Sequence, residues 1–336
     1  MSYKRSSILA EEISDYLQFR RAGGAKFEKE SVFNNFDAHL VSKHYESKIL
    51  NREIVMSFCS LKEGERITNL TIRVTNIRGF LNYLANIRKY EGTFNDIPPV
   101  STRNCGEYIP YIFSEEEIDK ILNEAHHHEI GYARNTCPNI LNVIPAILET
   151  LYCTGMRLGE AINLKVEDVD INQGIIYIRE AKNYNKRIVT MSDSLKEEMI
   201  RYCKESEKLE LSGIYFFDVG LPRNQGKLGK SIVYRYFRRI IKNVGIEHKG
   251  KGYGPRLHDL RHTFCCHSLK KLSQMDGDIN AYIVYLYTFM GHKSLRETQK
   301  YIWLTSDLFK DTLEKLEDYT NFISDLYEDS LHEEYV

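Results

Sequence analysis

Residues 93–112 lose the helical periodicity of apolar residues that runs through the chain on either side of them. The stretch contains Pro98, Pro99 and Gly106, a composition typical of a linker between domains. Domains commonly hold about 150 residues, so a chain of 336 residues has room for two. We therefore predict a first domain over residues 1–92, a linker over residues 93–112 and a second domain over residues 113–336.

The first domain is predicted to be a small bundle of helices. Apolar residues recur every three or four positions in four segments, as expected for helices that bury one face. These segments cover about residues 6–22, 28–44, 52–61 and 69–89. Gly23 and Gly92 follow the first and the last of them and are expected to end those helices.

The second domain is predicted to be mainly helical, with a small antiparallel β region. Ser114 and Glu117 form a capping box, in which each side chain bonds the backbone amide of the other, so a helix should begin there. Apolar residues in 174–178 and 187–191, joined by a polar stretch, predict a β-hairpin. Further helices are expected over residues 140–153 and 157–164, and from residue 194 onward.

Composition excludes several classes of protein. A hydrophobic content of 42% is enough to bury cores, which excludes a disordered or collagenous chain. The chain has no apolar run near the roughly 18 residues needed to cross a bilayer, which excludes a channel or transporter. Charges at Lys4, Arg5 and Glu11 leave no apolar stretch for a signal peptide, so we expect a cytoplasmic protein with no membrane partner. The seven cysteines form no Cys-x-x-Cys pair and are expected to be reduced thiols.

The near balance of 46 basic and 47 acidic residues hides an uneven distribution. Residues 302–336 hold ten acidic residues against two basic ones, whereas residues 221–261 hold eleven basic residues against two acidic ones. A basic segment of this density suits a polyanion, although a solvated helix face is the commoner meaning of a charge run. The candidate contacts are Lys227, Lys230, Arg235, Arg238, Arg239 and Lys242.

Two motifs of the second domain place basic residues outside regular elements. In residues 154–160, Arg157 lies at a break between helical segments. Glu160, one turn later, can bind its guanidinium through a bidentate contact. A structural salt bridge explains this pair equally well. The second motif is the hairpin loop, which offers Lys182 and Lys186.

Two further motifs place histidines near helix starts. His258 and Arg261 are three residues apart on a predicted helix, so they share a face and could bind the same anion. The alternative is a polar helix face that binds no ligand. His292 precedes a second capping box over residues 294–297, where the helix dipole favours an anion. Tyr301 follows His292 by nine residues and would need cationic neighbours before its hydroxyl could attack at neutral pH.

Taken in this order, the four motifs resemble the signature of the tyrosine recombinase (phage integrase) family. The resemblance rests on Thr154-Gly-Met-Arg-Leu-Gly-Glu160, on Leu257-His-Asp-Leu-Arg-His-Thr-Phe264, and on the segment from Met290-Gly-His292 to Tyr301. It extends from about Ser114 to Tyr301, and Met290 replaces the usual leucine, a conservative change. The first domain is similar to the family's core-binding domain only in length, helix content and position.

The resemblance implies a catalytic set around a nucleophilic tyrosine. The set is Arg157, Lys182, His258, Arg261 and His292 around Tyr301, with Glu160 in support. Lys182 is preferred to Lys186 because Arg187 then follows five residues later, as the family pattern has it. The two arginines would stabilise the charge that develops on a phosphate during its transfer.

The implied activity is the transfer of a DNA phosphodiester to tyrosine and back, which needs neither ATP nor a metal cofactor. The sequence has no Gly-rich phosphate loop and no carboxylate cluster for two metal ions. His126, His127 and His128 are adjacent on a predicted helix and point in different directions, so a surface run is favoured over a metal site.

The resemblance also implies double-stranded DNA and a homotetramer on synapsed DNA as partners. The first domain and the basic segment are expected to clamp the duplex. Residues 307–330 form an amphipathic pattern, predicted to be a helix that docks either in a neighbouring protomer or in its own. The expected event is integration and excision, or transposition, of a mobile element. The alternatives are chromosome dimer resolution, a type IB topoisomerase, a metal-dependent nuclease and a non-catalytic DNA-binding relative.

Overall fold

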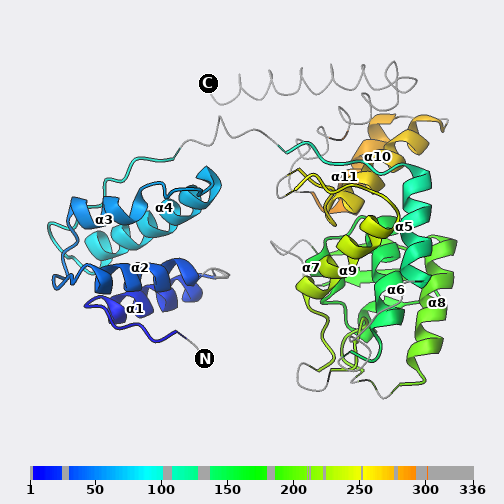
Figure 1. The fold of residues 1–336 in the computed structure, drawn as a ribbon, viewed down its shortest axis with the longest axis horizontal. Coiled ribbons are helices and arrows are strands. Elements are labelled where there is room, and N and C mark those ends of the chain that lie inside the picture. Colours follow the sequence, from blue (N-terminus) through cyan, green and yellow to red (C-terminus); the bar gives the residue numbers. More distant parts are fainter. Residues whose placement is uncertain are drawn as a thin grey trace. The chain divides into compact units, whose positions relative to one another are not determined.

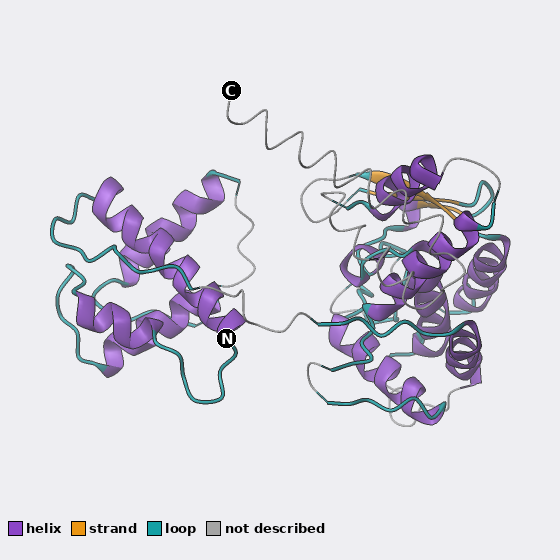
Figure 2. Cartoon of the chain, turned by 90° about the horizontal axis from the view of Figure 1, so that it is seen from above, coloured by secondary structure: helices purple, strands orange, loops and turns teal. Residues whose placement is uncertain are grey.

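The computed structural model describes residues 3–24, 30–100, 108–127, 137–179, 186–209, 211, 213–221, 225–250, 253–275, 279–292 and 301. The chain forms two compact units, Met1–Glu107 and Tyr108–Val336, and each is treated by itself below (Figure 1). Most described elements are helices, and the described strands form a small antiparallel sheet (Figure 2). The predicted fold class is therefore confirmed. The predicted C-terminal helix over residues 307–330 lies outside the described residues.

The first unit is a helical bundle packed around aromatic rings. Its helices are α1 (Ala10–Ala22), α2 (Ser31–Ser42), α3 (Arg52–Cys59) and α4 (Ile67–Asn82), and α4 continues into a π-helical turn, η1 (Tyr83–Ile87). The ring centroid of Tyr16 lies 5.6 Å from that of Phe33 and 5.4 Å from that of Phe80. Each of the four helices predicted for this part of the chain is present.

Both ends of the stretch predicted as a linker pack against a core. Ile97 is 3% exposed within the core of the first unit, and the N–H of Phe94 donates to the carbonyl of Leu50 at 2.8 Å. At the other end, Tyr111 packs on the core of the second unit, where its ring centroid lies 4.9 Å from that of Phe113. Part of the stretch therefore belongs to the folded units.

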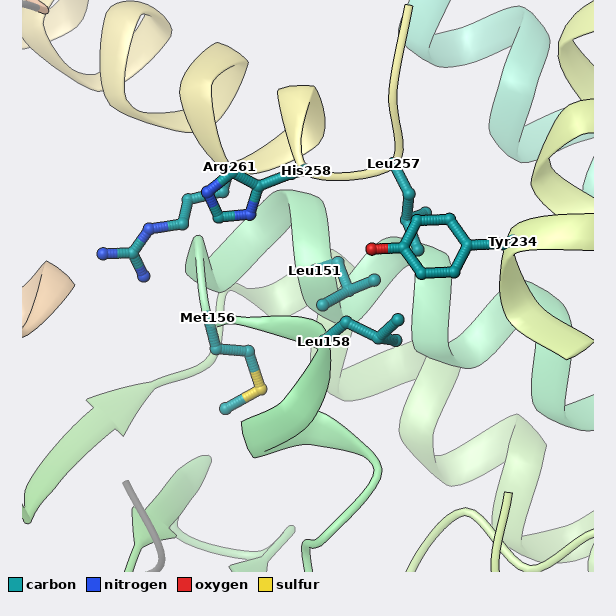
Figure 3. A pocket seen from close by; sticks show the side chains of 7 residues that line it. All are labelled: Leu151, Met156, Leu158, Tyr234, Leu257, His258 and Arg261. Atoms are coloured by element: carbon teal, nitrogen blue, oxygen red, sulfur yellow. The ribbon is translucent and has the colours of Figure 1, made fainter. Parts of the chain in front are cut away.

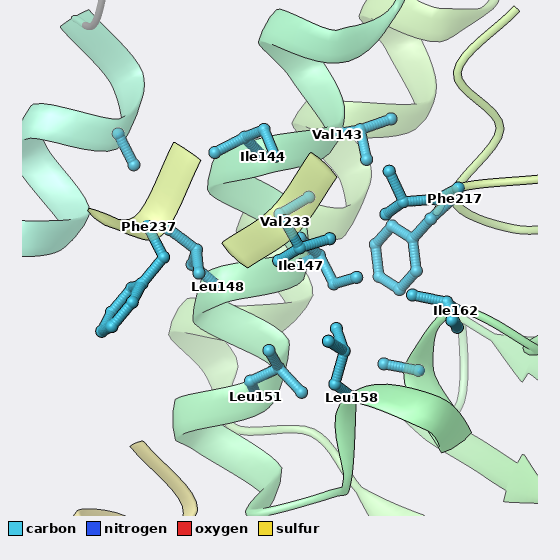
Figure 4. Close-up of a cluster of buried hydrophobic side chains, with 14 of the residues drawn as sticks. Val143, Ile144, Ile147, Leu148, Leu151, Leu158, Ile162, Phe217, Val233 and Phe237 are labelled. Carbon is cyan, nitrogen blue, oxygen red and sulfur yellow. The ribbon is translucent and has the colours of Figure 1, made fainter. Parts of the chain in front are cut away.

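The second unit is built around one apolar helix. Its helices are α5 (Glu115–His127), α6 (Ile140–Thr154), α7 (Leu158–Ala161), α8 (Asp193–Ser206), α9 (Lys230–Asn243), α10 (Asp259–Ser273) and α11 (Ile279–Met290). Helix α6 is apolar on most of its circumference and packs against α5, α8 and α10, as expected of a buried helix. Figure 4 shows Ile144, Ile147 and Leu151 of α6 among the apolar side chains that surround it. Within the described ranges, every helix falls short of the length or apolar character that spanning a bilayer requires.

The sheet consists of three short antiparallel strands. They are β1 (Val169–Asp170), β2 (Ile175–Ile178) and β3 (Arg187–Thr190), in the order β1-β2-β3, after the short 3₁₀ turn η3 (Val166–Asp168). Ile176 pairs with Val189, and both side chains are buried. The predicted hairpin is confirmed as β2 and β3, and β1 is an addition that the sequence did not reveal.

Candidate active site

The first predicted catalytic residue, Arg157, lies directly after the end of α6. Gly155 ends that helix with a φ of 58°, a backbone conformation that favours glycine. A Cβ atom at this position would lie 2.5 Å from the ring of Phe264 and 2.7 Å from the sulfur of Met290. The chain therefore turns in a space that only glycine fits, and the turn places Arg157 at the start of α7.

Glu160, on α7, connects Arg157 to a second arginine. Its carboxylate accepts hydrogen bonds from the backbone N–H of Arg157 at 3.0 Å and from the Arg157 guanidinium at 3.1 Å. It also accepts two bonds from Arg187 on β3, at 3.3 Å and 2.8 Å. Burial alone would raise the pKa of Glu160, but the bonds from Arg187 and Arg157 outweigh burial and hold the pKa below its ordinary value. The charged carboxylate thus joins α7 to β3.

Arg261, on α10, connects the ends of two helices. It is only 3% exposed, and its guanidinium donates to the carbonyl of Gly155 at 2.6 Å and to that of Met290 at 2.8 Å. These carbonyls stand at the C-terminal ends of α6 and α11, where a helix leaves acceptors unpaired and favours positive charge. Burial, together with the nearby charge of Arg157, lowers the pKa of Arg261 to about 10, so Arg261 remains charged at neutral pH.

Tyr301 lies in the same unit, with its hydroxyl beside α10. The hydroxyl oxygen is 2.8 Å from Nδ1 of His262. The tyrosine ring stacks on the ring of His292, with centroids 5.6 Å apart and an interplanar angle of 4°. The ring of His262 in turn meets that of His258 edge-on at 4.9 Å. Tyr301 is 6% exposed and packs in an apolar cluster with Cys265, so the phenol is almost enclosed.

The three histidines around Tyr301 are uncharged at neutral pH. Burial is the main cause, and Arg261 adds to it in each case: the pKa of His258 falls to about 4, and those of His262 and His292 fall to about 3. Burial also raises the pKa of Tyr301, while Arg261 opposes that rise. A phenol held in this way needs a proton acceptor and nearby cations before it can attack another atom.

A pocket opens beside these residues (Figure 3). His258 and Arg261 line it from the start of α10, and Tyr234 lines it from α9. The remaining lining is apolar, from Leu151, Met156, Leu158 and Leu257. His258 and Arg261 are three residues apart and so lie on the same side of the start of α10.

Five of the six residues predicted as catalytic are therefore brought into one region. They are Arg157, His258, Arg261, His292 and Tyr301, linked by the contacts given above. The sixth, Lys182, lies outside the described residues. Lys186, its alternative in the loop, is exposed directly before β3.

Two residues of this region were missed by the sequence analysis. His262 contacts the hydroxyl of Tyr301, and Arg187 contacts both Glu160 and the carbonyl of Phe289, the latter at 2.9 Å. A signal existed for His262, because it follows Arg261 directly and lies one helical turn after His258. For Arg187 the sequence motif gives only its spacing from Lys182 and no signal of its contact with Glu160.

The predicted basic contacts lie largely on one exposed helix face. Lys230, Arg235, Arg238, Arg239 and Lys242 are exposed on α9, whose other face is buried in the core. Lys227 is half-buried before this helix, with its ammonium 4.9 Å from the ring centroid of Tyr215. Lys230 reaches α7, since its Nζ lies 3.6 Å from the place that a Cβ on Gly159 would take. The start of α9 therefore lies next to α7.

A separate group of possible metal ligands lies on α5, α6 and α8. His126, Glu149 and Glu198 each offer a ligand atom, and these atoms lie within 4.8 Å of one another. Arg201 donates to both carboxylate oxygens of Glu198, at 2.7 Å and 2.5 Å. A cation would compete with this guanidinium for Glu198.

Comparison with known proteins shows the family. Residues 112–307, more than half of the chain, match the Phage integrase family. The tyrosine recombinase XerC of Syntrophus aciditrophicus is 28% identical over 309 residues, covering 87% of this chain and 92% of that relative. The integrase/recombinase y4rB of Sinorhizobium fredii is 26% identical over 317 residues, covering 93% of this chain and 98% of that relative.

Solved structures show the same fold. The XerH recombinase bound to a palindromic difH substrate, in a post-cleavage complex, aligns with a TM-score of 0.61 at 18% identity over 94% of this chain and 92% of that chain. The Tn1549 transposon integrase in complex with transposon right end DNA aligns with a TM-score of 0.57 at 16% identity over 86% of this chain and 94% of that chain.

The family match and the fold define the protein as a tyrosine site-specific recombinase, an enzyme that cleaves DNA and rejoins it. The chain belongs to the phage integrase family, which confirms the resemblance seen in its four motifs.

Proposed function

We propose that Tyr301 is the nucleophile of this recombinase. The observation that carries the proposal is the position of its hydroxyl, which lies within its own chain, 2.8 Å from an imidazole and in the field of Arg261. The phenolic oxygen would bond to a DNA phosphorus as the bond from phosphorus to the 5′ oxygen breaks. The product is a 3′-phosphotyrosyl bond, which a 5′ hydroxyl can attack in turn to rejoin a strand.

The neighbouring residues have distinct roles in this proposal. Arg157 and Arg261 bind the non-bridging oxygens and stabilise the charge of the transition state, because a planar guanidinium offers paired donors to a phosphate. His292 donates an N–H to a non-bridging oxygen, and His258 either assists removal of the proton from Tyr301 or holds the phosphate beside Arg261. Lys182 protonates the leaving 5′ oxygen. Glu160 supports Arg157 through the hydrogen bonds described above.

A suicide substrate tests the nucleophile directly. In such a DNA the cleaved strand carries a nick on the 3′ side of the scissile phosphate and close to it. The short fragment that carries the new 5′ hydroxyl therefore diffuses away, and the covalent product accumulates. Wild-type protein is expected to form a protein–DNA adduct that survives denaturation, and Tyr301→Phe is expected to form none while still binding the duplex. An adduct on Tyr301→Phe would assign the nucleophile to another residue.

The proposed biological event is the integration and excision, or transposition, of a mobile element. Support comes from the similarity to the integrase/recombinase of Sinorhizobium fredii, which extends over nearly all of both chains. This role would be supported if the gene lies in an element whose ends carry short inverted repeats and if the purified protein cleaves those repeats. Cleavage confined to a chromosomal resolution site would favour chromosome dimer resolution instead.

The proposed partners are double-stranded DNA and further copies of the same chain, as a tetramer on two synapsed sites. The basic face of α9 supports DNA binding, because it presents several exposed cations, of which Lys230 lies next to Gly159 of α7. A type IB topoisomerase would share the tyrosine chemistry but would relax supercoiled plasmid without a paired target. Recombination that needs two target sites, with no such relaxation, distinguishes the recombinase.

A further inference from the structure

His262 holds the hydroxyl of Tyr301 from a fixed position on α10. Its Nδ1 lies 2.8 Å from the phenolic oxygen, a normal hydrogen-bond length. The two rings lie 5.4 Å apart between centroids, and the ring of His258 supports His262 edge-on. An imidazole packed between two rings in the first turns of a helix has little freedom to turn away from the phenol.

We propose that His262 accepts the proton of Tyr301 when the tyrosine attacks DNA, an inference that rests on the proposed role of Tyr301 as the nucleophile. As the phenolic oxygen bonds to phosphorus, its proton moves to Nδ1 of His262. The bond from phosphorus to the 5′ oxygen breaks in the same reaction, and that oxygen takes a proton from Lys182. Rejoining runs the same transfers in reverse, so His262 returns the proton to the phenol.

The surroundings of His262 suit this task. The imidazole is uncharged, because burial and then the neighbouring His258 and Arg256 lower its pKa, so a ring nitrogen with a free lone pair is available to the phenol. A phosphate bound by Arg157 and Arg261 adds negative charge near the ring, and such charge favours the protonated imidazole. Binding of DNA is therefore expected to strengthen His262 as a proton acceptor at the moment when it is needed.

Two substitutions at position 262 separate proton transfer from positioning. His262→Asn keeps a hydrogen-bond acceptor near the place of Nδ1 but cannot take up a proton, whereas His262→Ala removes both functions. Both variants are expected to slow adduct formation on the suicide substrate by about 100-fold or more. The matched control is His267→Asn, since His267 lies on the same helix and its Nδ1 is 3.1 Å from the hydroxyl of a different tyrosine, Tyr152. It is expected to react as the wild type does.

A second substrate separates the two ends of the reaction. In it, sulfur replaces the bridging 5′ oxygen, so the leaving group departs without needing a proton. Lys182→Ala is expected to recover on this substrate because its role is to protonate the leaving oxygen. The His262 variants are expected to remain slow, because the phenol still has to lose its proton.

Each outcome decides a separate question. Near-normal cleavage by His262→Asn would overturn the proposal and leave His262 as a positioning residue, and recovery of both His262 variants on the sulfur substrate would also overturn it. Binding of the uncleaved duplex in a gel shift shows that a variant is folded, and His262→Asn, which keeps the hydrogen-bond acceptor, carries the test. If the wild type and His267→Asn form no adduct at all, the proposed function fails, whatever happens at His262.

Discussion

At the scale of single residues, the proposed catalytic region is held together by charged groups that contact the backbone or one another. Arg261 donates to carbonyls at the ends of α6 and α11, and Glu160 joins Arg157 to Arg187. The groups proposed to bind phosphate are therefore held in place before DNA arrives, which lowers the cost of ordering them during the reaction. Replacing Arg261 is therefore expected to remove two contacts to helix ends together with the proposed contact to phosphate.

One carboxyl away from this region, that of Glu149, is expected to lower the stability of the fold as the pH rises to neutral. Burial, followed by repulsion from Glu198, raises the pKa of Glu149 from its ordinary value of 4.5 to about 7, although Arg201 opposes the rise. The folded protein therefore holds this proton more tightly than the unfolded chain. Its contribution to stability is fully present below about pH 4.5 and is lost as the pH rises to about 7.

Glu149→Gln removes this loss. Above pH 7 the variant is expected to be more stable than the wild type by about 1 to 3 kcal/mol, since one pKa unit corresponds to about 1.4 kcal/mol and solvent screening reduces the full value. Near pH 4.5 the two proteins should unfold alike. Urea unfolding at both pH values measures the difference, with Glu197→Gln, an exposed position on α8, as the control. A gain of equal size at both pH values would contradict the explanation.

At the scale of elements, hydrophobic periodicity was sufficient to predict most helices and the hairpin. Strand β1 escaped prediction because two residues carry no periodic signal, and it exists through pairing of Val169 with Ile176. In the catalytic region, motif order pointed to Arg157, Arg261 and Tyr301. His262 and Arg187 escaped because their partners lie 39 and 27 residues away along the chain, so their contacts depend on tertiary packing.

The exposed basic face of α9 predicts how the affinity for DNA depends on salt concentration. If Arg238 contacts a DNA phosphate, Arg238→Ala is expected to weaken binding to target and non-target duplexes alike, because a phosphate contact carries no sequence information. The slope of log K against log salt concentration should decrease in magnitude by about one, as expected when one phosphate contact is lost. Lys208→Ala serves as the control, since Lys208 is exposed just beyond the end of α8 and pairs with Glu205 of that helix. A change confined to the target sequence would indicate a base contact instead.

At the scale of the whole molecule, the position of Tyr301 predicts that each chain cleaves with its own tyrosine. The phenol contacts His262 of the same chain, beside the Arg261 of that chain. A mixture of Tyr301→Phe with Arg261→Ala is therefore expected to stay about as inactive as either variant alone, because no chain then holds both groups. Adduct formation on the suicide substrate measures this, and a mixture of Tyr301→Phe with wild type is the active control. An adduct on the Arg261→Ala chain would show that tyrosines are exchanged between chains.

The enclosure of Tyr301 has a consequence for the fate of a broken strand. With 6% of the residue exposed, and with the ring of His292 stacked against it, solvent has little access to the oxygen that is proposed to become esterified. Hydrolysis of this ester would leave a permanent break in the DNA strand. We expect the covalent intermediate to persist until the 5′ hydroxyl of a strand attacks it, so that the DNA is rejoined and not left broken.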